Sequence, residues 1–177
     1  MAKGDRHTRT PGRPAKRRRT AIAVVVTVLA ATVVGYFAYR AQANLPGVQF
    51  ADQGNLHVPS ADTLHVQYNS EPPTSGPHLP YIAPWGVHTR PIVRELQVHN
   101  LEDGGVVVQY NCECPEIVAQ LRDIVKKYER NVLLAPYPTM KSKIVLTAWT
   151  RIDTLDDVDA KRITRFIEAY RGIDHHK

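Results

Sequence analysis

The longest apolar stretch of the chain covers residues 20–39, TAIAVVVTVLAATVVGYFAY, which contains no charged residue and no proline. About 20 apolar residues in a helix, at ~1.5 Å each, span the hydrocarbon core of a bilayer. A buried helix of a soluble domain is the alternative, but it would not require such length or the abrupt basic border on its N-terminal side. The pattern therefore predicts a single transmembrane helix over residues 20–39.

Two later segments repeat their apolar residues at helical spacing. In residues 115–130 the apolar positions recur three or four apart, charged residues cover the other side, and Pro115 stands in the first turn, where proline is tolerated. The same spacing runs from Val158 to Tyr170, with acidic residues near its start and Gly172 after its end. Both segments are predicted to be amphipathic helices.

Short β-rich runs supply the remaining regular elements. Strands are predicted at residues 64–68, 93–99, 106–110, 131–135 and 143–149. The Asp-Gly pair in the connecting NLEDGG favours a tight hairpin between the second and third of these. This order predicts an α+β fold, a single small domain in which the two helices pack on one face of a mostly antiparallel sheet.

Proline and glycine positions divide the chain further. Residues 69–86 hold five prolines and read as a rigid loop over the core, and residues 41–63 show no sustained periodicity. The predicted organisation is a basic cytoplasmic tail (1–19), a transmembrane helix (20–39), a stalk or linker (40–63), an exported α+β domain (64–172) and a disordered tail (173–177).

The formal net charge of +6 is concentrated at the N-terminus. Residues 1–19 carry eight basic residues and one acidic residue, and the rest of the chain holds 15 basic and 16 acidic residues. The nearly neutral remainder argues against nucleic-acid binding by the folded domain. By the positive-inside rule the chain is a single-pass protein of the cell membrane, with a cytoplasmic N-terminus and an extracytoplasmic C-terminal domain. The small-x-small triplet at residues 41–43 leaves a cleaved signal peptide, cut after Ala43, as the alternative.

Three motifs give the chain a resemblance to a known family. They are EPPTSGPH (71–78), VHNLEDG (98–104) and LTAW (146–149). The chain resembles, from about Tyr68 to Tyr170, the bacterial family called domain of unknown function 3105. That family's pattern pairs a Ser-Gly-Pro-His loop with Val-His-x-Leu-Glu-His-Gly and a later Ala-Trp. The loop matches here are Ser75, Gly76, Pro77 and His78.

The resemblance implies a short, anchored, exported protein and no assigned activity. One position departs from the pattern, because Asp103 stands where the family usually has a second histidine.

His78, His99 and Asp103 form the first candidate site, with Glu102 as a fourth ligand or a partner of a histidine ring. Imidazole and carboxylate groups together suit zinc, copper(II) or iron. From the residues alone, ordinary structure is the alternative, since Asp-Gly favours turns and His99 ends a predicted strand. The remaining histidines, including His57, His175 and His176, are scattered or terminal and are given no role.

Cys112 and Cys114 form the second candidate and are the only cysteines in the chain. Placed before a helix, they suit copper(I) or redox chemistry as thiolates, a small disulfide, or a structural role as inert thiols. Thioredoxin-type chemistry would instead call for Cys-x-x-Cys.

Three functions remain open from the sequence. The first is a membrane-anchored, extracytoplasmic module that binds copper or zinc without catalysis. The second is a structural or interaction module of the cell envelope that has an envelope protein as its partner and binds no metal. The third is a metal-assisted hydrolase with Glu102 as its base. The sequence favours a binding protein over an enzyme.

Overall fold

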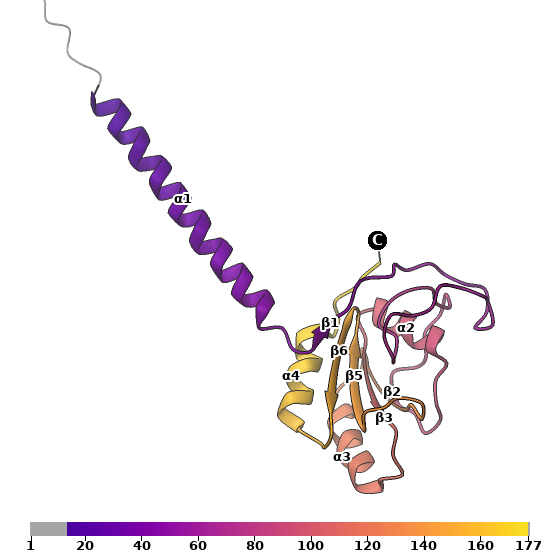
Figure 1. The fold of residues 1–177 in the computed structure, drawn as a ribbon. Coiled ribbons are helices and arrows are strands. Elements are labelled where there is room, and N and C mark those ends of the chain that lie inside the picture. Colours follow the sequence, from indigo (N-terminus) through magenta and orange to yellow (C-terminus); the bar gives the residue numbers. More distant parts are fainter. Residues whose placement is uncertain (1–13, 177) are drawn as a thin grey trace, which may run out of the picture. The chain divides into compact units, whose positions relative to one another are not determined.

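The computed structural model describes residues 14–176, and a boundary after Leu45 separates two compact units. The first contains helix α1 (Pro14–Ala43), shown in indigo in Figure 1. Its segment Arg19–Arg40 is long and apolar enough to cross a membrane, and none of the side chains in that window is buried. Residues 1–13 of the predicted basic tail lie outside the described residues.

The second unit is built on a six-stranded sheet. Its strands are β1 (Val48–Gln49), β2 (Gly86–Val87), β3 (Val106–Tyr110), β4 (Val132–Pro136), β5 (Ile144–Ala148) and β6 (Arg151–Leu155). They lie in the order β1-β6-β5-β3-β4-β2. The α+β fold is confirmed, but the sheet is mixed, since β4 runs parallel to both β3 and β2 while the other pairs are antiparallel.

Helices cover both faces of this sheet (Figure 1). Helices α3 (Pro115–Val125) and α4 (Ala160–Tyr170) pack on one face, against side chains such as Val106 and Val108. Helix α2 (Arg94–Glu102) packs on the other face, where Val98 and Leu101 meet Val107. Alternate residues of β3 thus pack into the hydrophobic cores on opposite faces of the sheet, as the pleat of a strand requires. The prediction that the two amphipathic helices share one face is confirmed, but α2, which covers the other face, was not predicted.

Helix α2 replaces the predicted strand 93–99 and its hairpin. Residues 97–102 are all buried, and four of these six are polar, so no solvent-facing stripe marks the helix in the sequence. The Asp-Gly pair ends the helix instead of turning a hairpin. The amide of Gly104, with φ of 73°, donates to the Leu101 carbonyl, and the amide of Gly105 donates to that of Asn100. This pair of bonds is the Schellman motif that closes many helices.

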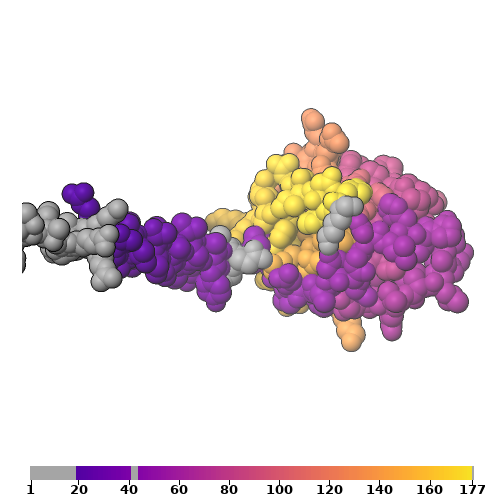
Figure 2. All heavy atoms as spheres, turned by 90° about the horizontal axis from the view of Figure 1, so that it is seen from above, coloured from indigo at the N-terminus to yellow at the C-terminus, as the bar shows by residue number. Residues whose placement is uncertain are grey.

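Part of the predicted stalk belongs to the folded unit, which begins at Pro46. Strand β1 pairs with β6, and His57 forms a β-bridge with His78. Residues 64–68 are not a strand, in contrast to the prediction. Figure 2 shows the segment that follows α1 (violet) on the same face of the second unit as the C-terminal residues (yellow).

Candidate metal centre

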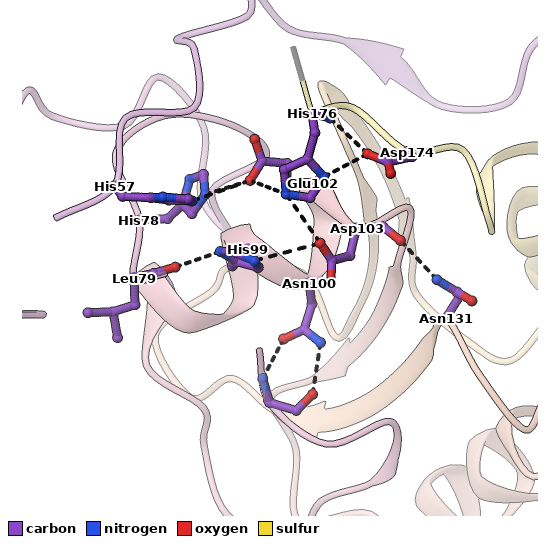
Figure 3. Close-up of polar contacts among 11 residues, drawn as sticks. His57, His78, Leu79, His99, Asn100, Glu102, Asp103, Asn131, Asp174 and His176 are labelled. Atoms are coloured by element: carbon purple, nitrogen blue, oxygen red, sulfur yellow. Dashed lines mark hydrogen bonds and ion pairs between the residues drawn. The ribbon is translucent and has the colours of Figure 1, made fainter. Parts of the chain in front are cut away.

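Three histidines and one glutamate meet on the α2 side of the sheet. We call His57, His78, His99 and Glu102 the inner group. Each offers one nitrogen or oxygen atom, and these four atoms lie within 4.8 Å of one another (Figure 3). The ring centroids of His78 and His99 are 5.1 Å apart. A tetrahedral ion with bonds of about 2 Å holds its ligand atoms roughly 3.3 Å apart, so small side-chain movements would complete such a shell.

The inner group is assembled from three segments. His99 and Glu102 are three residues apart in the last turn of α2, a spacing that places both on one face of a helix. His78 lies within the proline-rich loop. Its backbone is joined to the His57 segment by the Val58 N–His78 O and His78 N–Leu56 O hydrogen bonds of 2.8 and 2.9 Å. One helix turn and one β-bridge therefore bring the four side chains together.

Backbone carbonyls fix the orientation of two of the rings. Nδ1 of His78 lies 2.7 Å from the Gly76 carbonyl, and Nδ1 of His99 lies 2.7 Å from the Leu79 carbonyl. Because a carbonyl only accepts, each Nδ1 carries a proton, and Nε2 is the ring nitrogen that faces the centre. Metal-bound histidines are oriented in this way, with the second ring nitrogen donating to a carbonyl or carboxylate.

The loop before His78 is held firmly. Ser75 Oγ accepts a 3.0 Å hydrogen bond from the Gln53 amide, and the Pro77 carbonyl accepts a 2.5 Å bond from the Tyr68 hydroxyl. Gly76 has φ of 114°, and a Cβ there would lie 3.2 Å from the Tyr68 ring. The three predicted loop residues thus position the carbonyl that orients His78.

Glu102 is the electrostatic focus of the site. Its Oε2 lies 2.9 Å from Nε2 of His78, and these two side chains are 1% and 0% exposed. Its Oε1 is buried and makes no hydrogen bond that satisfies distance and angle among the described residues, although the Asn55 side chain is close enough to affect the pKa of the carboxyl. A buried carboxylate oxygen this close to an imidazole nitrogen requires a proton or a metal ion between the two atoms.

The pKa shifts agree with a centre poised for a cation. Burial raises the pKa of Glu102, but the nearby Asn55 side chain and the neighbouring His78 and His176 outweigh this effect and hold that pKa below 4.5. Burial lowers the pKa of His99 below 6.5, against the opposing effects of the Leu79 carbonyl and Asp103. Both shifts favour the metal-competent forms, carboxylate and neutral imidazole.

A second group adjoins the first. We call His99, Asp103 and His176 the outer group; its ligand atoms also lie within 4.8 Å of one another. Asp103, predicted to share a site with His78, is not among the four residues of the inner group. His57 and His176, which were given no role, each belong to one group. Single histidines far apart in the sequence carry no local signal, so only the fold associates them.

The cysteines form a different site. Cys112 and Cys114 are joined in a disulfide, and Cys114 is the N-cap of α3. They follow the C-terminal end of β3, whereas α2 precedes its N-terminal end. The sulfurs are therefore not thiolate ligands here, and the strand separates them from the inner group.

Comparison with known proteins places the chain in a family. A family model described as protein of unknown function (DUF3105) matches residues 59–177. The chain belongs to this family. The matched region contains His78, His99, Glu102 and the outer group, whereas His57 precedes it. No curated protein and no solved structure matches the chain.

Proposed function

We propose that this DUF3105 protein is a membrane-anchored module that binds one transition-metal ion through His57, His78, His99 and Glu102. The observation that carries the proposal is the buried Glu102 carboxylate, whose Oε2 lies 2.9 Å from Nε2 of His78 and whose Oε1 makes no hydrogen bond of good geometry among the described residues. The arrangement has the donor set, the oriented rings and the buried carboxylate that would hold an ion.

The donor atoms favour zinc(II) or copper(II). Imidazole nitrogen and carboxylate oxygen suit these borderline ions, whereas copper(I) prefers thiolate and thioether sulfur. The disulfide removes the two cysteine thiolates from consideration. Four protein ligands also close a tetrahedral shell, which is typical of sites that hold an ion rather than activate water. We therefore propose metal holding or sensing in preference to hydrolysis.

The location of the module follows from α1. The segment Arg19–Arg40 has the length and apolarity of a membrane span, and a signal sequence would have the same features. The excess of basic residues before it supports an anchored protein with a cytoplasmic N-terminus. The inner group would then meet metal ions outside the cytoplasm.

Metal titration of the full-length chain in detergent micelles tests the proposal. We expect zinc(II) or copper(II) to bind with one ion per chain and to raise the melting temperature as the ion concentration rises. The double variant His78→Ala/His99→Ala should abolish both effects. The matched control is His65→Ala/His88→Ala, which removes two histidines outside both groups. Equal metal responses in the two double variants, or no response in the wild type, would favour an envelope interaction module without a metal.

A further inference from the structure

The outer group is more exposed to solvent than Glu102 and His78 of the inner group. The side chains of His176 and Asp103 are 46% and 31% exposed, whereas those of Glu102 and His78 are 1% and 0% exposed. His176 Nε2 lies 3.5 Å from Asp103 Oδ1 and 3.3 Å from Glu102 Oε2. One imidazole nitrogen therefore reaches a carboxylate of each group, so the two positions for an ion are adjacent.

His99 is shared between the two groups. Its Nδ1 is held by the Leu79 carbonyl, so Nε2 alone remains to bind an ion, and it lies 3.6 Å from Asp103 Oδ1. The rings of His57 and His176 lie near it, with centroids 5.2 and 5.9 Å away. A single lone pair binds one ion, so the inner and outer groups cannot both have their full set of ligands. They are alternative positions for one ion.

The main chain of residues 172–176, which we call the C-terminal segment, positions His176. The amide of Gly172 donates to the Gly104 carbonyl at 2.7 Å, and the amide of His175 donates to the Glu102 carbonyl at 2.9 Å. Asp174 Oδ1 lies 2.7 Å from Nδ1 of His176, which leaves Nε2 directed at the two carboxylates (Figure 3). The His175 ring stacks on Trp149 at 5.7 Å.

From these relationships, and resting on the proposed function, we infer that the outer group is a loading site for the inner one. A divalent ion first binds His176, Asp103 and His99 at the surface. It then exchanges His176 and Asp103 for Glu102, His78 and His57 while His99 Nε2 stays bound. The ion keeps its charge, and ligands are replaced one at a time. The C-terminal segment thus supplies the ligand, His176, that first captures the ion before it moves to the inner group.

A kinetic experiment tests this inference because a loading site changes rates and leaves the end state alone. The full-length chain carries Trp85→Phe, so that Trp149, whose ring lies 6.3 Å from that of His78, is the only indole and its quenching by copper(II) reports binding. Stopped-flow mixing gives the association rate constant, and release to a chelator gives the dissociation rate constant. Equilibrium titration gives Kd and the number of ions bound.

We expect His176→Ala and Asp103→Asn each to slow association and dissociation by the same factor, about tenfold, with Kd unchanged and one ion per chain. The matched controls are His88→Ala and Asp157→Asn, which should leave both rates as in the wild type. His78→Ala should instead weaken Kd.

Three results would overturn the inference while the proposed function stands. Unchanged rates in both outer variants would place the route of the ion elsewhere, for example past His57, whose side chain is 46% exposed. A weaker Kd caused by faster dissociation alone would make His176 an ordinary ligand of the bound ion. Two ions per wild-type chain would make the groups independent sites. If the wild type binds no ion, the proposed function itself fails.

Discussion

His78 and Glu102 lie 24 positions apart in the sequence, and their side chains meet at 2.9 Å in a buried site. Because Nδ1 of His78 donates to the Gly76 carbonyl, Nε2 is the ring nitrogen that faces the carboxylate. At this distance either a proton or a bound metal ion must lie between Nε2 and Oε2. This relationship makes Glu102 the most informative residue to change.

Glu102→Gln should weaken zinc(II) or copper(II) binding by roughly 100-fold or more, because an amide keeps the size of the side chain but loses its charge. Isothermal titration of the full-length chain measures the effect. The matched control is Glu116→Gln in the first turn of α3, where the side chain is exposed. If Glu102→Gln keeps wild-type affinity, the carboxylate is not a ligand.

The apo protein should show a pH dependence that comes from His99. Its pKa in the native state is lowered below 6.5 by burial. As pH falls below 6.5, the unfolded chain takes up this proton before the native chain does, so the free energy of unfolding decreases until the lowered pKa is passed. Urea denaturation across this range should show the loss, and His99→Gln should remove this part of it. A His99 ring that titrates at or above 6.5 by NMR contradicts the prediction.

His176 should titrate in the opposite direction. Its hydrogen bond with Asp174, aided by the nearby Glu102 and Asp103, raises its pKa above 6.5. The stability that this protonated ring contributes is complete below 6.5 and is lost as pH rises through the raised pKa. NMR titration of the ring protons measures this, and Asp174→Asn should move the pKa of His176 downward. No movement would show that Asp174 does not hold the ring.

Gly104→Ala should destabilise the domain and displace the C-terminal segment. The residue has φ of 73°, and a Cβ there would lie 2.6 Å from the backbone nitrogen of Ile173. We expect a loss on the order of 2–4 kcal/mol, the sum of left-handed strain and a steric clash with backbone.

Gly54→Ala is the matched control for this change. Gly54 has φ of 80° and no atom within 4 Å of its Cβ position, so it carries the strain alone, about 1–2 kcal/mol. Chemical denaturation compares the two variants. Equal losses would mean that the close approach of Ile173 does not constrain position 104.

The cysteine pair should be dispensable for metal binding. Cys112→Ser/Cys114→Ser should leave the affinity for zinc(II) and copper(II) within about twofold of the wild type, because the pair lies at the far end of β3 from α2. Stability should fall only slightly, since a disulfide that closes so short a loop constrains the unfolded chain little. A large loss of affinity in this variant would restore the pair as part of the metal site.

The membrane orientation predicts a protection pattern in intact cells. External protease should digest the domain after residue 45 and leave residues 1–19 shielded, because the basic residues precede the apolar helix. The mass of the mature chain distinguishes an anchor from a signal peptide, since cleavage after Ala43 would remove α1. Protection of the domain would reverse the orientation.

The sequence by itself determined the elements whose chemistry is local. Three local patterns were sufficient to predict elements: the apolar run of α1, the β-branched residues of β3 and the amphipathic periodicity of α3 and α4. In each, the side chains on one surface share one environment, so the pattern is visible in neighbouring residues. The Ser-Gly-Pro-His loop was likewise visible as a motif. Strand β6 was not predicted, because its sequence RIDTL mixes charged and apolar residues and shows no such pattern.

Only the tertiary structure decided the nature of α2 and the membership of the site. Gln97, His99, Asn100 and Glu102 are all buried, so α2 lacks the alternation of apolar and polar faces by which an amphipathic helix is recognised. The burial of these polar side chains depends on partners from other segments. His57 and His176 lie 119 positions apart in the sequence. The β-bridge of His57 with His78 and the hydrogen bond from the His175 amide to the Glu102 carbonyl bring both rings close to Glu102. A site assembled from distant segments leaves no periodic pattern in the sequence. The sequence therefore supplied only a list of candidate ligands, and the packing of α2 decided which of them lie together.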